Sequence, residues 1–327
     1  MSMLLGGFDI GGTKCAAVLG IAEDGKIDVL AKRAFPTPNS PAEAIRQFGE
    51  AMEELLAKTL ETGSLQAIGI SCGGPLDSRR GLVLSPPNLP GWDGIDVVTP
   101  LRQRFGVPVA LQNDANACAL AEWRWGAGQG VSNMVFLTFG TGMGAGLILD
   151  GRLYAGISDM AGEAGHIRLE NDGPVGYGKA GSFEGFCSGG GIARLGHAMA
   201  EKRIQEGGTT AICQDVAELD GITAKAVFDA ANDGDALALE VVGIVGRKLG
   251  RGLALLIDLL NPERIVIGSI YARQEALLRP IVMEELAREA LPLSLAACGI
   301  VPAGLGEHVG DAASLSVALY ALEQARR

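Results

Sequence analysis

Apolar residues at the start of the chain come in short runs broken by turns, a pattern typical of strands. Residues 4–21 are apolar on both sides of a Gly11-Gly12-Thr13-Lys14 break, and an acidic turn separates them from a third run over 27–35. We interpret these runs as three strands joined by two tight turns. A Ser-Pro pair at residues 40–41 then precedes apolar residues at helical spacing, which predicts a helix over 42–60.

Two further apolar runs end in small and polar residues. The run 65–71 is followed by Cys72-Gly73-Gly74, and the run 107–111 is followed by Gln112-Asn113-Asp114 and a predicted helix over 115–125. Open α/β sheets bind ligands beyond the carboxyl ends of their strands, so both strand ends are candidate site positions. The proline-rich segment 86–92 between them predicts a loop.

The pattern of the first residues recurs from residue 133. Apolar runs over 134–139 and 145–149 are separated by a glycine turn over 140–144, and an acidic turn leads to a third short segment over 152–154. Both copies therefore read strand, glycine turn, strand, acidic turn, strand. This internal duplication predicts two similar lobes.

The last third of the chain predicts a long helix over 236–260, a buried strand over 264–267 and a final helix over 312–324. A chain of 327 residues exceeds the usual size of one hydrophobic core. We therefore expect two α/β lobes, each a mixed sheet flanked by helices, with a ligand cleft between them. One lobe would hold residues 1–114 and 312–327, and the other residues 115–311.

The composition disfavours several classes of function. A formal net charge of −11 disfavours nucleic acid as a partner, because binding to its phosphates relies on clustered Lys and Arg. The most apolar stretch, 253–270, is interrupted by charged residues and proline, so we expect no membrane span. The six cysteines lack C-x-x-C spacing, and the first residues lack a signal-peptide pattern. We expect a cytoplasmic enzyme that acts on a small molecule.

The two glycine turns are the first candidates for chemistry. Their backbone N–H groups can approach an anion closely, so two such turns could hold the phosphates of a nucleotide. Neither matches a Walker A sequence or the Rossmann fingerprint, and either turn alone is more readily explained as an ordinary hairpin. Their duplication favours the phosphate interpretation. Asp9 lies just before the first turn and is placed to hold Mg²⁺ directly or through water.

Three other acidic residues and a histidine are further candidates. Asp114 stands at a predicted helix start, where Asn or Asp is more often an N-cap, although a cap can also be a general base. Glu163 and His166 lie three residues apart among small residues, and Glu184 follows in another glycine-rich segment. Such groups recognise sugar hydroxyls, but Glu163 and His166 fit a surface helix pair equally well.

Four motifs, in order, resemble those of the ROK family of bacterial sugar kinases and sugar-responsive repressors, in the actin-like ATPase superfamily. They are Asp9-Ile10-Gly11-Gly12-Thr13-Lys14, Asn113-Asp114-Ala115-Asn116, Gly140-Thr141-Gly142-Met143-Gly144-Ala145-Gly146 and Gly162-Glu163-Ala164-Gly165-His166. The resemblance covers nearly the whole chain and implies a two-lobed, ribonuclease H-like fold. The loop Asn88-Leu89-Pro90-Gly91-Trp92 is most similar to that of the glucokinase branch.

The resemblance also implies roles for single residues. Asp114 would be the general base that takes the proton of the attacking sugar hydroxyl. The sugar would contact Gly74, Asn88, Asn113, Asp114, Glu163, His166 and Glu184. ATP would contact Asp9, Gly11, Gly12, Thr13, Lys14, Gly140, Thr141, Gly142, Gly144, Gly268 and Gly310, with Mg²⁺ held by Asp9 through water. Dimers and tetramers are common in this family, so we expect a homo-oligomer.

Two positions depart from the family's pattern. Many members carry a C-x-C-G-x-x-G-C zinc motif after the histidine, but the corresponding positions here are Val175, Tyr177 and Ser182. No thiolate is left to bind zinc, so we predict a zinc-free loop shaped by its glycines and by packing of Tyr177 and Phe183. The family's Gly-Gly after the C-terminal strand is Gly268-Ser269, which is expected to alter the adenosine pocket.

The resemblance implies an ATP- and Mg²⁺-dependent kinase for a hexose or N-acetylhexosamine, with the 6-hydroxyl of a glucose-type sugar favoured. A repressor is disfavoured, because such proteins carry a DNA-binding helix-turn-helix ahead of the kinase-like core, which here begins near residue 4. A non-catalytic sugar-binding regulatory protein of the same family is the alternative.

Overall fold

The computed structural model describes residues 2–59 and 63–325, which form two compact units. Unit 1 holds the described residues up to Ser132, those of Gly146–Ala161 and those from Gly304 onward, and unit 2 holds Asn133–Ala145 and Gly162–Ala303. This division differs from the predicted boundaries after residues 114 and 311. Helix α3 (Asp114–Trp125) belongs to unit 1 because the last helix, α10 (Val309–Ala325), packs against α3 as well as against the sheet.

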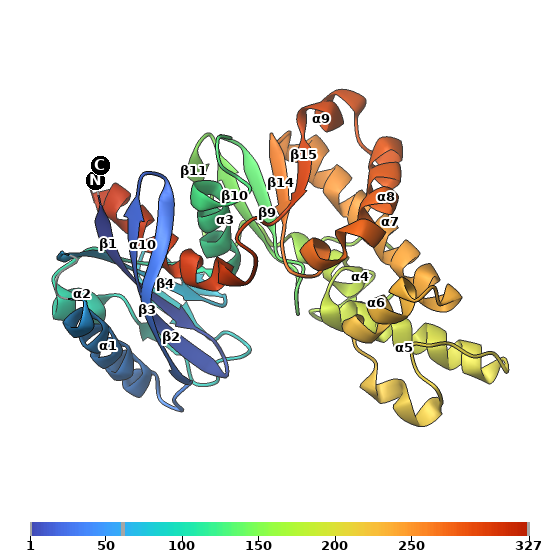
Figure 1. Ribbon diagram of the computed structural model, residues 1–327, viewed down its shortest axis with the longest axis horizontal. Coiled ribbons are helices and arrows are strands. Elements are labelled where there is room, and N and C mark those ends of the chain that lie inside the picture. Colours follow the sequence, from blue (N-terminus) through green and yellow to red (C-terminus); the bar gives the residue numbers. More distant parts are fainter. Residues whose placement is uncertain (1, 60–62, 326–327) are drawn as a thin grey trace. The chain divides into compact units, whose positions relative to one another are not determined.

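Unit 1 is built on a five-stranded sheet with the order β3-β2-β1-β4-β8 (Figure 1). Its strands are β1 (Met3–Ile10), β2 (Lys14–Glu23), β3 (Lys26–Pro36), β4 (Leu65–Cys72) and β8 (Val109–Asn113). The first three strands are antiparallel, which confirms the predicted meander, whereas β4 runs parallel to both β1 and β8. The carboxyl ends of β1, β4 and β8 therefore meet at one edge, where Ile10 pairs with Cys72 and Cys72 with Asn113.

Helices cover both faces of this sheet. On one face, α1 (Pro41–Lys58) and α2 (Thr99–Phe105) close a core in which the rings of Phe8 and Phe48 lie 4.7 Å apart. On the other face, Leu5 packs with Leu315 of α10. The predicted helix over 42–60 is thus confirmed up to Lys58, and its last predicted residue, Leu60, lies outside the described residues.

Gly69 in β4 is a point of close approach between the sheet and α10. A Cβ atom at Gly69 would lie 2.1 Å from the main-chain oxygen of Ser314 and 2.3 Å from the main-chain nitrogen of Ala318. Because a helix backbone cannot move aside like a flexible side chain, Gly69→Ala is expected to lower the free energy of unfolding by about 3 kcal/mol. Gly221→Ala, at a site with open space around it, is the control in urea unfolding. Equal midpoints for the two variants would contradict this prediction.

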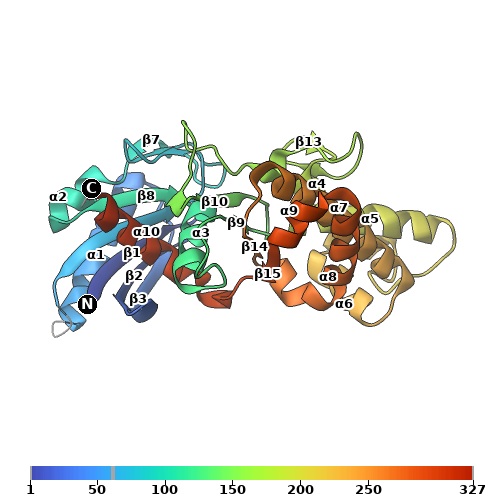
Figure 2. The same cartoon turned by 90° about the horizontal axis from the view of Figure 1, so that it is seen from above.

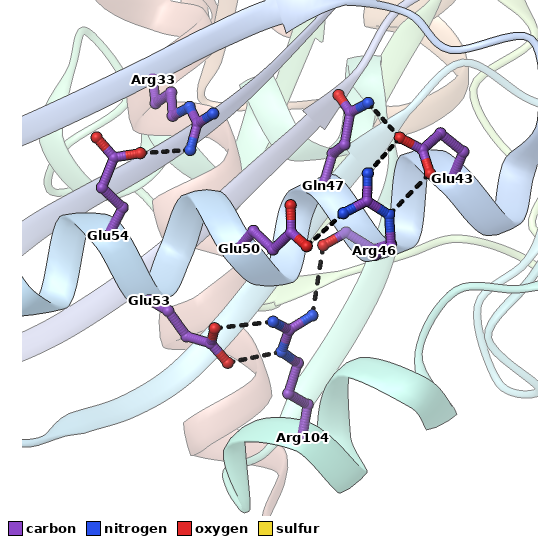
Figure 3. A network of polar contacts seen from close by, with 8 residues as sticks. All are labelled: Arg33, Glu43, Arg46, Gln47, Glu50, Glu53, Glu54 and Arg104. Carbon is purple, nitrogen blue, oxygen red and sulfur yellow. Dashed lines mark hydrogen bonds and ion pairs between the residues drawn. The ribbon is translucent and has the colours of Figure 1, made fainter.

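Ion pairs follow the exposed face of α1 (Figure 3). Arg46 pairs with the glutamates one turn before and after it, Arg33 of β3 pairs with Glu54, and Arg104 of α2 pairs with Glu53. The Arg104 Nε and Nη2 atoms lie 2.7 and 2.8 Å from the two Glu53 oxygens. Exposed pairs contribute only about 0–1 kcal/mol each, so the apolar face of α1 provides most of its stabilisation.

A small sheet of β5 (Leu76–Asp77), β6 (Leu82–Leu84) and β7 (Asp93–Asp96) completes the described core of unit 1. The predicted loop over 86–92 connects β6 to β7. Leu89 and Trp92 of this loop are only 1% exposed, and the Ser85 N–H donates to the Trp92 carbonyl at 2.9 Å. The loop is therefore a packed element. A hairpin of β10 (Ala145–Leu149) and β11 (Arg152–Leu153) follows in sequence.

Unit 2 contains three parallel strands, β9 (Met134–Leu137), β14 (Arg264–Ile267) and β15 (Gly299–Pro302), with β14 in the middle. Its longest helix, α7 (Ala236–Leu260), and β14 match the predicted ranges. Asp235 caps α7 by accepting from the Ala238 N–H at 2.8 Å, and Asn261 ends the helix in a left-handed conformation.

The other helices of unit 2 pack around α7 (Figure 2). They are α4 (Phe183–Phe186), α5 (Gly189–Gln205), α6 (Ala224–Asn232), α8 (Ile270–Glu289) and α9 (Pro292–Ala297). Short 3₁₀ turns lie at Ala164–His166, labelled η1, and at Val216–Gly221, and the strands β12 (Val175–Gly176) and β13 (Lys179–Ala180) form a small hairpin. Within the described residues, no helix combines the length and the apolar character needed to cross a bilayer.

Candidate functional site

Carboxylates gather at the edge of unit 1 where β1 and β8 end. Asp9 is the next-to-last residue of β1, Asp114 follows β8 directly, and Asp311 lies in the first turn of α10. Burial raises the pKa of Asp9 to about 6, with further increases from Asp114 and Asp311, while Lys32 and Lys14 oppose the shift. The Asp9 carboxylate thus lies in a recess with little water, near two other carboxylates, of which Asp311 pairs with Lys32.

The helix start at Asp114 is capped by its neighbour. The Asn113 Oδ1 accepts from the Asn116 N–H at 2.7 Å, so Asn113 is the N-cap of α3, and the interpretation of Asp114 as the cap is wrong. The Asp114 Oδ1 accepts from the adjacent Ala115 N–H at 2.8 Å. Asp114 is accessible to solvent. Protein atoms around its carboxylate nevertheless displace much of the surrounding water, and this loss of hydration raises its pKa. An accessible carboxylate with a raised pKa can act as a general base.

The first glycine turn joins β1 to β2 at the same edge. The Gly11 N–H donates to the Lys14 carbonyl at 3.2 Å, and the Thr37 hydroxyl donates to the Gly11 carbonyl at 2.6 Å. The Thr37 N–H also donates to the Thr13 carbonyl at 3.1 Å. The turn is therefore held by β3's carboxyl end, and the Thr13 and Lys14 side chains are exposed.

Asn88 of the packed loop touches this turn. A Cβ atom on Gly12 would lie 2.6 Å from the Asn88 main-chain oxygen, and one on Gly73 would lie 3.6 Å from the Asn88 Oδ1. Gly74 has open space beside it. The structure therefore brings Asn88 close to both the first turn and the strand end at Gly73.

The second glycine turn, Gly140 to Gly144, lies in unit 2. It is closed by a hydrogen bond from the Gly140 N–H to the Gly142 carbonyl at 3.1 Å, and the Gly144 N–H donates to the Thr138 hydroxyl at 2.8 Å. The Gly189 N–H at the start of α5 donates to the Gly140 carbonyl at 2.7 Å. Thr141 is exposed at the tip of the turn.

Three of the predicted sugar ligands cluster beside this second turn. Glu184 at the start of α4 accepts from the Met143 N–H at 3.0 Å, so its carboxylate lies against the turn. Glu163 precedes the 3₁₀ turn η1 and His166 is its last residue; both are exposed to solvent and are not a pair on an α-helix. A Cβ atom on Gly165 would lie 2.2 Å from the Met143 oxygen and 3.2 Å from the Glu184 Cβ. Only glycine allows η1 to pack this closely against Glu184.

The loop that leads to Glu184 is held partly as expected. Phe183 is fully buried against Gly252 of α7, which confirms its predicted packing role. Tyr177 is 75% exposed, so the expectation that it packs the loop is wrong. Ser182, one of the three positions that lack the family's cysteine, caps α4 through a 3.0 Å hydrogen bond from the Gly185 N–H. The described residues contain no group of three or more His, Cys, Asp or Glu side chains able to hold a metal.

A pocket of about 730 Å³ lies within unit 2. Its lining includes Gly140 and Thr141 of the second turn, together with Ser269 and Arg273 of α8 and Lys225 of α6. The size suits a nucleoside, and the backbone of a glycine turn at its wall suits phosphates. Neither α6 nor α8 was predicted from the sequence pattern, and Lys225 and Arg273 were therefore not among the candidate residues.

Gly268 and Gly310, two further residues expected to contact ATP, lie in different units. Gly268 follows β14 and is buried next to Phe136, directly before the pocket-lining Ser269. Gly310 lies in the first turn of α10 in unit 1, beside Asp311. Among this pair, only Gly268 adjoins the unit 2 pocket.

Ser269 is strained in a way that glycine would not be. Its φ of 54° and ψ of −112° lie in a region that side chains rarely occupy, and its hydroxyl makes no capping bond to α8. Ser269→Gly is therefore expected to raise the free energy of unfolding by about 1 kcal/mol, the relief of strain less the entropic cost of glycine. Asn261→Gly is the control, because Asn tolerates the left-handed conformation at residue 261. No gain in Tm for Ser269→Gly would contradict this prediction.

The family model for the ROK family matches residues 5–318. This chain belongs to the ROK family. Among its ROK relatives, a glucokinase from Halalkalibacterium halodurans is 34% identical over 283 residues, which cover 84% of this chain and 83% of that protein. An N-acetylmannosamine kinase from Escherichia coli is 32% identical over 277 residues, which cover 84% of this chain and 86% of that protein.

A solved ROK structure agrees over nearly the whole chain. The structure of a ROK family glucokinase from Streptomyces griseus in complex with glucose and AMPPNP matches with a TM-score of 0.73 and 31% identity, covering 97% of this chain and 99% of that one. The comparisons confirm the predicted family, the predicted α/β fold of the actin-like ATPases and the predicted enzyme class, a sugar kinase.

Proposed function

We propose that this ROK kinase transfers the γ-phosphoryl group of ATP to a hydroxyl of a hexose or N-acetylhexosamine, with the 6-hydroxyl of glucose as the favoured acceptor. The relatives named glucokinase and N-acetylmannosamine kinase support this range of sugars. Phosphoryl transfer requires mainly positioning, neutralisation of charge and one group that orients the nucleophile. We assign the last of these roles to Asp114.

The accessibility of the Asp114 carboxylate and its raised pKa are the main support for the proposal. Asn113 caps α3 in its place, which leaves the Asp114 carboxylate accessible at the carboxyl ends of the parallel strands. Its raised pKa makes it a better proton acceptor than an ordinary aspartate once it is ionised. From this position it takes the proton of the sugar hydroxyl as the oxygen attacks phosphorus.

A magnesium ion fits the recess around Asp9. Mg²⁺ favours one or two carboxylates with several waters and substrate phosphates, and burial beside other carboxylates raises the pKa of Asp9 to about 6 in the protein alone. Asp9 would hold the ion through water, with Asp114 and Asp311 contributing negative charge nearby. An ion held there would supply positive charge to neutralise the transferring phosphates.

The proposed kinase function also assigns contacts to the nucleotide and to the sugar. The unit 2 pocket holds adenosine, and the N–H groups of the two glycine turns bind phosphates. Asn88, Asn113, Glu163, His166 and Glu184 bind sugar hydroxyls. We also propose that the protein works in the cytoplasm as a homodimer or homotetramer and without zinc.

A panel of sugars with ATP and Mg²⁺, read by ADP release, tests the proposal. The panel contains glucose, mannose, fructose, allose and their N-acetylamino relatives. Sugar-dependent ADP release with glucose at the highest kcat/KM is the expected result. Purified, folded protein that releases no ADP with any of these sugars would overturn it.

Glu184 and His166 are expected to act on sugar binding more than on chemistry. Hydrogen bonds made equally in the ground and transition states change KM and leave kcat nearly unaltered. Glu184→Ala and His166→Ala should each raise the sugar KM by about tenfold, the effect of one lost hydrogen bond to a charged group. Steady-state kinetics at saturating ATP measure this, with Tyr177→Phe as a control beside His166. An unchanged KM in both variants would refute these roles.

A further inference from the structure

The chain between His166 and Glu184 forms one closed loop. The Leu169 and Glu170 N–H groups both donate to the Gly181 carbonyl, at 2.8 and 3.1 Å, and the Phe183 N–H donates to the Ile167 carbonyl at 2.8 Å. The two ends of the loop are thus tied together, immediately after one proposed sugar ligand and immediately before the other. A shift of this loop, residues 167–182, would displace His166 and Glu184 together.

Apolar packing holds the tip of the loop weakly. The β12–β13 hairpin that forms the tip exposes Val175 by 46% and Tyr177 by 75%. Gly173 does lie against the ring of Phe186, since a Cβ atom there would be 2.4 Å from the ring. A segment with two large exposed apolar side chains requires other contacts to fix its position.

Charged groups of α7 supply such contacts at Glu170. The Glu170 Oε1 pairs with the Lys248 Nζ and lies 2.6 Å from the Arg251 Nη1. Lys248 is well covered, with a side chain 13% exposed, and its ammonium lies 5.2 Å from the centre of the Phe186 ring. Phe186 belongs to α4, the helix that carries Glu184. Lys248 therefore contacts both the loop and the helix that it leads to.

The second cation, Arg251, connects Glu170 to a rigid part of unit 2. Its Nε lies 2.7 Å from the Oε1 of Glu285, a carboxylate of α8 that is only 2% exposed. Glu285 also pairs with Arg288 at 2.6 Å. The packing of α7 against α8 fixes these groups, so Glu170 is anchored to two long helices rather than to another mobile side chain.

We propose that Glu170, held by Lys248 and Arg251, is a positioning residue that fixes the 167–182 loop and thereby orients His166 and Glu184 for the sugar. Lys248 and Arg251 also hold the pKa of Glu170 below its usual value, so the carboxylate stays ionised at neutral pH. The inference rests on the proposed sugar-binding roles of His166 and Glu184.

Four variants test this role. Glu170→Gln removes the charge at constant size, Lys248→Met removes its partner while keeping an apolar stem, and the double variant combines them. Glu289→Gln is the matched control, because Glu289 has the same 39% side-chain exposure and also lies near Arg251 but is on α8, away from the loop. Two readouts are used: amide hydrogen exchange without substrate, and the KM values for sugar and ATP.

Hydrogen exchange reports on the loop independently of any activity. We expect Glu170→Gln and Lys248→Met to raise exchange over 167–182 and Glu289→Gln to leave it unchanged. Exchange at wild-type rates in both variants would overturn the proposal. If the wild type phosphorylates no sugar, the proposed function fails, yet faster exchange in the variants would still support the positioning of the loop by Glu170.

The kinetic readout separates positioning from general stability. We expect Glu170→Gln to raise the sugar KM by about tenfold with the ATP KM within about twofold, because a displaced ligand set weakens sugar binding alone. The effect of the double variant should be smaller than the sum of the two single effects, since both single variants remove the Glu170–Lys248 pair. Parallel loss of sugar and ATP binding, or additive effects in the double variant, would overturn the proposal.

Discussion

Asp114→Asn is expected to lower kcat by about 10²- to 10⁴-fold, because the variant can position the sugar hydroxyl but cannot take its proton. The amide oxygen of Asn can still accept from the Ala115 N–H, and Asn113 still caps α3, so the helix start is preserved. Sugar binding should persist. Initial rates of ADP release measure kcat, and calorimetric titration with the sugar measures binding.

Asp24→Asn is the control for Asp114→Asn, since Asp24 is an exposed turn residue in a left-handed conformation that Asn also tolerates. It should retain wild-type kcat. A tenth or more of wild-type activity in Asp114→Asn would refute the general-base assignment. A wild type that binds sugar without turnover would instead support the non-catalytic alternative.

The main strands and the longest helix could be predicted because local sequence decides them. In α7, apolar residues recur on one face and Asn261-Pro262 ends the pattern, and the predicted range 236–260 is the observed one. The helix α8 could not be predicted in the same way. It contains Pro280, bends at Gln274 and begins at the strained Ser269, so three local signals oppose a helix that packing against α7 nonetheless stabilises.

The start of α5 could not be predicted from local sequence either. Its first three residues are glycines, which favour a turn, but the Ser188 hydroxyl accepts from the Gly191 N–H and caps the helix. Gly191 is also needed for packing, because a Cβ atom there would lie 2.0 Å from the Gly185 oxygen. A requirement set by contact between two helices cannot be read from one segment alone.

The candidate site likewise contains residues that local sequence identifies and one that it does not. The glycine turns, Asp9 and Asp114 stand in local motifs and could be found from the sequence. Glu170 could not, because its partner Lys248 is 78 residues away, and only the packing of the loop against α7 brings the two charges together.

Asp9→Asn is expected to lower kcat/KM by at least about 10²-fold, because a neutral amide at this position cannot offset the positive charge of Mg²⁺. The wild-type enzyme should lose kcat/KM as the pH falls below about 6, where Asp9 takes up a proton. Activity at several Mg²⁺ concentrations measures the first effect. A variant with wild-type kcat/KM and unchanged dependence on Mg²⁺ would refute the role of Asp9.

The same substitution should stabilise the ligand-free protein. The pKa of Asp9 is raised in the folded state, from 3.8 to about 6, so the stability associated with its protonated form is fully present below about pH 3.8 and is lost as the pH rises through 6. At pH 8 this loss is on the order of 3 kcal/mol, which an uncharged Asn does not incur. Asp9→Asn should therefore have a higher Tm than the wild type at pH 8 but not at pH 4. Equal Tm values at pH 8 would show that the ionised carboxylate carries no such cost and would contradict this prediction.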